Sequence, residues 1–180
     1  MTLPDVVPAA RILDFFRAGF EHTAWRLETR REYAADQGSE EYQQFLQGVA
    51  PPLDDGGPWF TNARAQTADG RRIERVRLVD EPPTDNQRYL LATTPANLAA
   101  GEDIRYLYRA EADAIGLTDA GDFWLFDSRV LARFNWTDPE RRMELTTDPE
   151  QVVWACQVRD AAWHYAVPYG DFTVRVPSPM

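Results

Sequence analysis

Carboxylate and arginine side chains are the groups in this chain whose types and spacing best suit acid–base chemistry. Glu102 and Asp103 end a loop, and Arg105 follows two residues later. Alternate residues of a strand share a face, so a strand beginning here would place Asp103 and Arg105 on one side. Two interpretations stay open: an ion pair that orders the loop, or an acid–base element in a cleft. If the protein is an enzyme, Glu102, Asp103 and Arg105 are the predicted catalytic residues.

The densest basic cluster lies between residues 71 and 77. On a strand, Arg75 and Arg77 would share one face while Val76 and Leu78 face the core. One interpretation is cross-strand pairing with acidic residues of this chain. The other is a patch that binds a small anion or an acidic partner, with RNA as a further case.

Other catalytic signatures are missing from the sequence. Its two histidines, His22 and His164, have no other histidine at zinc-ligand spacing, so no metal site is predicted. None of the serines lies in a Gly-x-Ser-x-Gly turn. Cys156 is the only cysteine and is interpreted as a buried structural thiol. We expect no cofactor.

Charge and composition narrow the function classes further. The chain has 180 residues, 29 acidic against 19 basic, and a net charge of −10. Every basic residue is Arg, which excludes lysine Schiff-base chemistry and a Walker-type phosphate loop. Net negative charge argues against binding to duplex DNA. The sequence lacks a signal peptide pattern and a run of 18 apolar residues, so a cytoplasmic location without membrane contact is expected.

The elements that must position these groups follow from periodicity. We expect helices over residues 11–28 and 39–48, the second with Ser39 as its N-cap, and a short helix after the capping box at 84–87, which begins with Thr84. A further helix should run from its N-cap Asp148 to about Ala166. Strands are expected at 59–66 and 71–79 around a hairpin turn, then at 104–110, 122–127, 130–136 and 141–146. The strand at 122–127 is apolar on both faces and should be internal. The predicted fold is α+β: a mostly antiparallel sheet of five or six strands flanked by an N-terminal helix pair and a C-terminal helix. Residues 1–180 would form a single domain with short flexible ends at 1–9 and 170–180.

Both terminal helices carry a second apolar stripe. Behind the core side of the first helix, Phe15, Ala18, His22 and Trp25 follow helical spacing. The last helix has two such stripes on opposite sides. Either each helix packs between other elements of this chain, or one stripe binds a partner chain, since interfaces are rich in aromatic residues. The predicted partner-binding residues are Phe15, His22, Trp25, Arg75 and Arg77.

Several short strings point to a family. They are Arg26-Leu27-Glu28 with Phe16, Ala24 and Tyr33, then Gly101-Glu102-Asp103-Ile104-Arg105, then residues 122–127 with Val130 and Phe134. Across residues 12–167 the chain resembles an actinobacterial family of unknown function whose members are often encoded beside Xre-type helix-turn-helix regulators. The resemblance implies a regulatory or toxin–antitoxin-like neighbourhood, and it assigns no functional residue.

The leading hypothesis is a non-catalytic cytoplasmic module that binds another polypeptide, with a helix-turn-helix regulator encoded nearby as the candidate partner. The absence of catalytic signatures, the acidic charge and the surplus aromatic stripes favour it. Two alternatives stay open: a small ribonuclease-like or toxin-type enzyme using carboxylate, Arg and Tyr groups, and a sensor domain for a small ligand.

Overall fold

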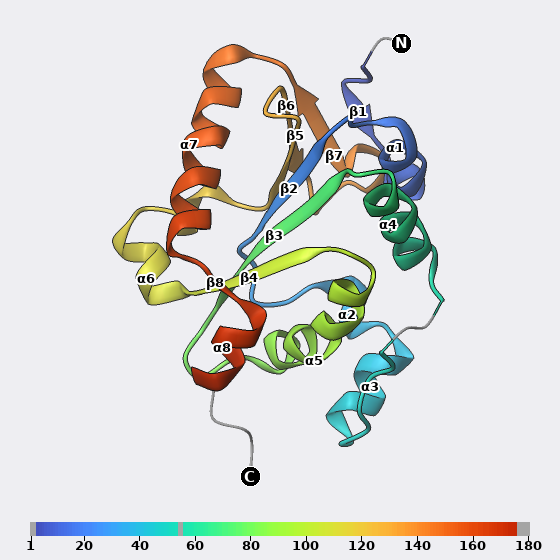
Figure 1. Cartoon of the computed structure of the whole chain (residues 1–180), viewed down its shortest axis with the longest axis vertical. Coiled ribbons are helices and arrows are strands. Elements are labelled where there is room, and N and C mark those ends of the chain that lie inside the picture. Colours follow the sequence, from blue (N-terminus) through green and yellow to red (C-terminus); the bar gives the residue numbers. More distant parts are fainter. Residues whose placement is uncertain (1–2, 54–55, 176–180) are drawn as a thin grey trace.

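A mixed eight-stranded sheet runs through the centre of the molecule, and helices cover both of its faces (Figure 1). The computed structural model describes residues 3–53 and 56–175. Their strands are β1 (Val6–Val7), β2 (Thr23–Glu28), β3 (Arg72–Val79), β4 (Asp103–Tyr108), β5 (Phe123–Phe126), β6 (Val130–Phe134), β7 (Met143–Thr146) and β8 (Val167–Pro168), in the order β1-β7-β6-β5-β2-β3-β4-β8. The α+β class is confirmed. The expected mostly antiparallel sheet of five or six strands is wrong, because the sheet has eight strands and mixes parallel with antiparallel pairs.

Three adjacent strands in the middle of this sheet run parallel. β2 pairs with β3 and β3 pairs with β4 in parallel register, while the other neighbours are antiparallel. Parallel neighbours need a crossover connection, and helices supply it here. α4 (Pro58–Ala68) precedes β3, and α5 (Asp85–Ala99) joins β3 to β4. The sequence pattern predicts a helix at the start of α5, but it misses the crossover through α4 because it predicts a strand for that segment.

The first predicted helix is wrong beyond residue 18. α1 covers only Ile12–Ala18, and the chain turns at Gly19 before entering β2. A Cβ on Gly19 would lie 2.5 Å from the Phe15 carbonyl oxygen, so the turn needs glycine. In β2 the alternation of a strand applies: Trp25 and Leu27 face one side of the sheet, and Glu28 faces the other.

Of the hairpin expected at residues 59–79, the second strand is confirmed and the first is wrong. β3 is present, but residues 58–68 form α4, with Gly57 at its N-cap and Pro58 in its first turn. Proline is favoured at that position because its missing N–H would have no helical partner. The Asp-Gly pair follows the helix, where Gly70 has φ +84° and ends it.

Other local predictions are confirmed. Phe123 and Trp124 are buried in the internal strand β5. Three predicted N-caps accept a backbone N–H in their helices: Ser39 before α3 (Glu40–Leu46), Thr84 in a full capping box before α5, and Asp148 before α7 (Pro149–Tyr165).

Two helical layers enclose the sheet. α6 (Arg109–Ala114) and α7 cover the face that carries Trp25, Leu27 and Phe123. α1 and α4 cover the opposite face around Phe16 and Trp124. In Figure 1 α7 lies on the left of the sheet and α1 and α4 on the right. Residues from both apolar stripes of α7 pack against the cluster around Trp25, Leu27 and Phe123. They are Trp154, Cys156, Val158, Ala161 and Trp163, each partly buried.

The chain ends expected to be flexible carry short elements. In the N-terminal stretch, β1 pairs with β7 and η1 (Ala9–Arg11) leads into α1. Near the other end, α8 (Tyr169–Arg175) buries Phe172 against Tyr106. Residues 1–2 and 176–180 lie outside the described part. The remaining short helices are α2 (Ala34–Gln37), η2 (Thr118–Ala120) and η3 (Pro139–Arg141). Among residues 3–53 and 56–175, no helix has the length and apolarity to cross a membrane.

Candidate functional site

A buried ionic network occupies the face of the parallel strands that points toward α4 and α5. The Glu28 carboxylate accepts hydrogen bonds from Arg75 at 2.8 Å and from Arg77 at 3.0 Å. Arg26 lies 3.5 Å from the same carboxylate. On the other side, Arg75 donates to Glu102 at 2.7 Å. These groups come from three neighbouring strands because residues of one parity share a face.

The charged groups of this network stay ionised in the folded protein. Burial opposes ionisation of Glu28, but the guanidinium groups of Arg77, Arg26 and Arg75 outweigh it and lower the pKa of this carboxyl far below its usual range. Burial likewise opposes the charge on Arg77, yet Glu28 and Tyr106 raise its pKa. Both partners therefore stay ionised at all physiological pH values. Neither is poised to transfer a proton.

The remaining partners close the network. Glu102 also accepts from the Trp59 indole N–H at 2.6 Å and from Asn97 at 2.7 Å. Arg77 donates to Thr94 at 2.9 Å and to Tyr106 at 3.2 Å. The cavity beside Glu28 and Arg77 measures about 10 Å³. There is no room for a substrate, so the arrangement serves structure.

Asp122 and Asp127, which flank β5, act as caps at opposite ends of that strand. Asp122 accepts from the Thr29 N–H and hydroxyl and from the Tyr33 hydroxyl. Asp127 accepts backbone N–H groups of Glu21, His22 and Thr23 at 2.7–2.8 Å. Both carboxylates are used by the fold, and they do not form a pair.

The residues predicted for an enzyme are not brought together. Glu102 lies on the network face, whereas Asp103 and Arg105 lie on the α7 face, 3.7 Å apart. The Arg105 guanidinium stacks on Trp163 at 3.8 Å from the ring centroid. The ion-pair interpretation fits Asp103 with Arg105. The three residues do not share a cleft.

Three of the five predicted partner-binding residues are buried. Trp25 lies in β2 and not on a helix, and it is only 1% exposed. Arg75 and Arg77 are 7% and 5% exposed and are engaged in the network. A partner cannot reach these side chains. Phe15 is half-buried and His22 is exposed, and they line two different depressions.

The larger depression is an open groove of about 1000 Å³ between α1 and the start of α7. Its apolar lining includes Phe15 and Ala18 of α1 and Val152 and Val153 of α7. Val153 is 55% exposed. The other lining residues come from the segments 3–14 and 19–21, from the β5–β6 turn with the first residue of β6, and from residues 147–149 after β7. The groove combines an apolar floor with charged residues at its rim.

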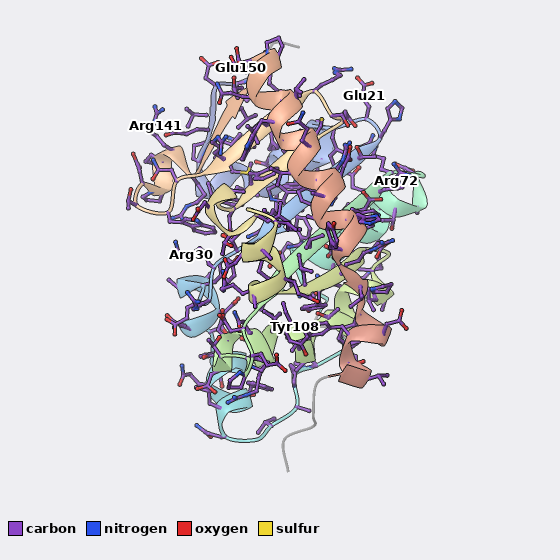
Figure 2. All side chains as sticks on the ribbon, turned by 90° about the vertical axis from the view of Figure 1, so that its left-hand side faces the viewer. Glu21, Arg30, Arg72, Tyr108, Arg141 and Glu150 are labelled. Carbon is purple, nitrogen blue, oxygen red and sulfur yellow. The ribbon has the colours of Figure 1, made fainter. Side chains whose placement is uncertain are left out.

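The second depression is a cleft of about 650 Å³ on the α7 face of the sheet. It brings together both histidines of the chain, from the segment before β2 and from the end of α7. The lining residues are His22, Thr23, Trp25, Arg72, Glu74, Asp127, Ser128, Arg159, Asp160, Trp163 and His164. Figure 2 looks onto α7 and shows Arg72 at one side of this helix, near Glu21.

The β5–β6 turn separates the groove from the cleft. Asp127 and Ser128 line both, and both have positive φ, at +51° and +53°. They are the two central residues of the turn Phe126–Arg129, which the Arg129 N–H closes on the Phe126 carbonyl at 2.9 Å, and two such left-handed residues fit the twist of a hairpin. The Asp127 hydrogen bonds attach this turn to the residues at the start of β2, and they hold the turn in place between the groove and the cleft.

Sequence reasoning missed most residues of these depressions. Val153 was counted in neither stripe of its helix, and His164, Arg159 and Arg72 were not connected with His22. Their separation along the chain is large, and spacing rules act only within one element. A strand assignment for residues 23–28 would have placed Trp25 with Arg72 and Glu74 through the parallel register of β2 and β3. Within residues 3–53 and 56–175, no three His, Cys, Asp or Glu side chains are grouped to hold a metal.

Comparison with known proteins identifies a family but no chemical reaction. The family model described as "Domain of unknown function (DUF6879)" matches residues 10–174. No curated protein matches the chain. The solved structure "NucT from Helicobacter pylori" is 10% identical over 89% of this chain and 90% of that one, with a TM-score of 0.42. A likeness at that level carries no argument about chemistry.

Proposed function

The chain belongs to the family of unknown function DUF6879, and from its geometry we propose a non-catalytic module that binds a helical segment of another protein in the groove between α1 and α7. The observation that carries the proposal is this open groove of about 1000 Å³ with the half-exposed Val153 in its wall. We further propose a cytoplasmic location. The first candidate partner is a helix-turn-helix regulator encoded nearby.

The apolar wall favours a polypeptide ligand. Phe15 and Ala18, three residues apart and therefore neighbours on one side of α1, line the groove together with Val152 and Val153 of α7. An amphipathic helix presents apolar side chains at a matching spacing, and such helices bind hydrophobic grooves in many complexes. Exposed apolar surface of this kind is typical of interaction sites.

A helix suits the groove better than an added strand. β1 is the edge strand of the sheet and lines the groove, but it has only two residues. Pro4 and Pro8 stand on either side of it and cannot donate a ladder hydrogen bond. This edge therefore offers little backbone for strand addition.

The rim supports specificity. Arg11 and Asp14 form an exposed ion pair at 2.8 Å on the α1 side, and Arg129 and Glu21 lie nearby among the lining residues. Charges of both signs at the rim of an apolar groove select partners by complementary charge. An amphipathic helix with charged flanks would satisfy them.

The test is a binding titration of the purified full chain with the regulator encoded beside it, and with displayed fragments of the same genome as a wider source of partners. Val153→Glu places a charge in the wall at the start of a helix, where the dipole tolerates it. We expect this variant to raise Kd at least about tenfold. The matched control is Val49→Glu, since Val49 is 51% exposed and does not line the groove.

Unchanged melting temperatures in both variants are required, so that the comparison reports on the groove. If Val153→Glu and Val49→Glu bind equally well, the groove is not the docking site. If neither the regulator nor any fragment binds in a way that depends on Val153, the proposed function is wrong.

A further inference from the structure

We propose that the cleft between β2, β3 and α7 binds a phosphoryl group carried by a small molecule. This site is separate from the groove between α1 and α7, and its existence does not depend on the proposed function. The cleft contains Trp25, Arg72 and Arg159, and both histidines of the chain.

A buried donor at the floor of the cleft lacks an acceptor. The Trp25 side chain is 1% exposed and lines the cleft, and its indole Nε1 has no hydrogen-bond partner within the described residues. A buried N–H without an acceptor is costly, and native structures contain few of them. Neighbouring atoms cover this N–H, so a ligand oxygen that displaced them would supply the missing acceptor.

Other donors converge on the same space from four segments. Arg72 comes from the start of β3, Arg159 and His164 come from α7, His22 precedes β2, and Ser128 lies in the turn after β5. Arg159 already donates to the Ser128 hydroxyl at 2.6 Å, which fixes its guanidinium beside the turn. A hydroxyl that accepts this bond keeps its own hydrogen for a ligand.

The carboxylates in the cleft are each held by local partners. Asp127 accepts hydrogen bonds from three backbone N–H groups, and Asp160 lies 2.9 Å from Arg159. Glu74 lies 3.5 Å from Arg72. Burial, helped by Asp103, raises the pKa of Glu74 despite the neighbouring Arg72. Each of these three carboxylates therefore has its own hydrogen-bond donors or a neighbouring arginine.

The number and kind of donors favour a phosphoryl group over a carboxylate. Guanidinium groups bind phosphate through paired hydrogen bonds, and a tetrahedral oxyanion has oxygens for several further donors. A carboxylate has two oxygens. The cleft of about 650 Å³ is much larger than a phosphate ion. The half-buried Trp163 ring offers an apolar surface for the rest of the ligand.

The test uses NMR on the full chain, because its only two histidines both line the cleft. The probes are inorganic phosphate and adenosine 5′-monophosphate, with adenosine and acetate as controls at equal ionic strength. We expect saturable shifts of both imidazole signals and of the Trp25 indole signal, identified with Trp25→Phe. Both phosphate probes should produce them, and adenosine and acetate should not.

Two matched variants connect the shifts to the cleft. Arg159→Gln should raise Kd about 10- to 100-fold, as expected for loss of a charged hydrogen bond. Arg141→Gln is the control, since Arg141 also pairs with a neighbouring acid, Glu144 at 3.1 Å. Figure 2 places Arg141 on the opposite side of α7 from Arg72. His164→Gln, at an exposed position, gives a second variant if Arg159→Gln does not fold.

Each other outcome overturns the proposal. Silent histidine and Trp25 signals at millimolar phosphate mean that the cleft does not bind it. Equal effects of acetate mean a response to charge alone, and equal effects of adenosine mean recognition of the base. Equal loss in Arg159→Gln and Arg141→Gln means that binding is diffuse over the surface.

Discussion

Glu28 in β2 and Arg77 in β3 stand at the same level of two parallel strands, and their side chains meet at 3.0 Å beneath α5. Together with Arg75, this buried ion pair links β2 to β3. A buried ion pair is weak evidence for stability by itself, but breaking one leaves an uncompensated charge.

We therefore expect Glu28→Gln to lower the free energy of unfolding by about 3–5 kcal/mol, because Arg75 and Arg77 would lose their shared anion. Urea unfolding monitored by circular dichroism measures it. The control is Arg17→Gln, which removes the exposed pair between Arg17 and Asp14 and should change stability little. Equal effects of the two substitutions would contradict the structural role of the network.

Trp25→Ala should lower the free energy of unfolding by about 3–5 kcal/mol. The ring is buried against Phe123 and the apolar cluster under α7. A thermal melt beside the binding titration separates this effect from docking in the groove. A melting temperature close to that of the unsubstituted chain would mean that Trp25 is not core.

Asp127 should make stability depend on pH. Burial opposes its charge, but the backbone N–H groups of Thr23, Glu21 and His22 outweigh this and lower its pKa. Because the folded-state pKa lies below the unfolded-state value of about 4, the ionised carboxylate stabilises the fold above that pH. This stabilisation is lost as the pH falls through the folded-state pKa.

Asp127→Asn tests that dependence, since asparagine also tolerates a positive φ. We expect the variant to be about 1 kcal/mol less stable at neutral pH, allowing for solvent screening. The difference should shrink toward pH 2. Urea unfolding at a series of pH values measures it, and a constant difference would show that the charge is unimportant.

The prediction that the chain does not bind duplex DNA stays open. With a net charge of −10, and with Arg75 and Arg77 buried, phosphate contacts would have to come from scattered arginines. We expect no shift of random duplex DNA at physiological salt in a gel assay. A salt-dependent complex formed by this chain alone would contradict that expectation.

Local signals predicted much of the fold. The N-caps Ser39, Thr84 and Asp148 were found because a cap and the helix it begins are adjacent in sequence. The strand at 122–127 was found because an apolar run of that length is typical of an internal strand.

Residues 23–28 show where the sequence fails. Trp25 and Leu27 fit an amphipathic helix as a continuation of α1, and they fit an alternating strand equally well. A run of six residues is too short to separate the two periods. The decision comes from β3 and β5, which pair with this segment from distant parts of the chain.

The ionic network was half predictable. Arg75 and Arg77 were placed on one face of a strand, and pairing with acids of this chain was one interpretation. Their burial depends on Glu28 and Glu102, which are close only after the parallel register has formed. The groove and the cleft join segments from both ends of the chain, so no local pattern contains them.

The place of β2 in the sheet has a consequence for synthesis on the ribosome. This strand is made early, yet its neighbours β3 and β5 follow much later, and β5 comes from the last third of the chain. Once residue 79 has left the ribosome, β3 can pair with β2, and Arg75 and Arg77 can meet Glu28. The other edge of β2 stays unpaired until β5 is made, at residue 126. The chain must therefore complete the core around Trp25 and Leu27 late in elongation.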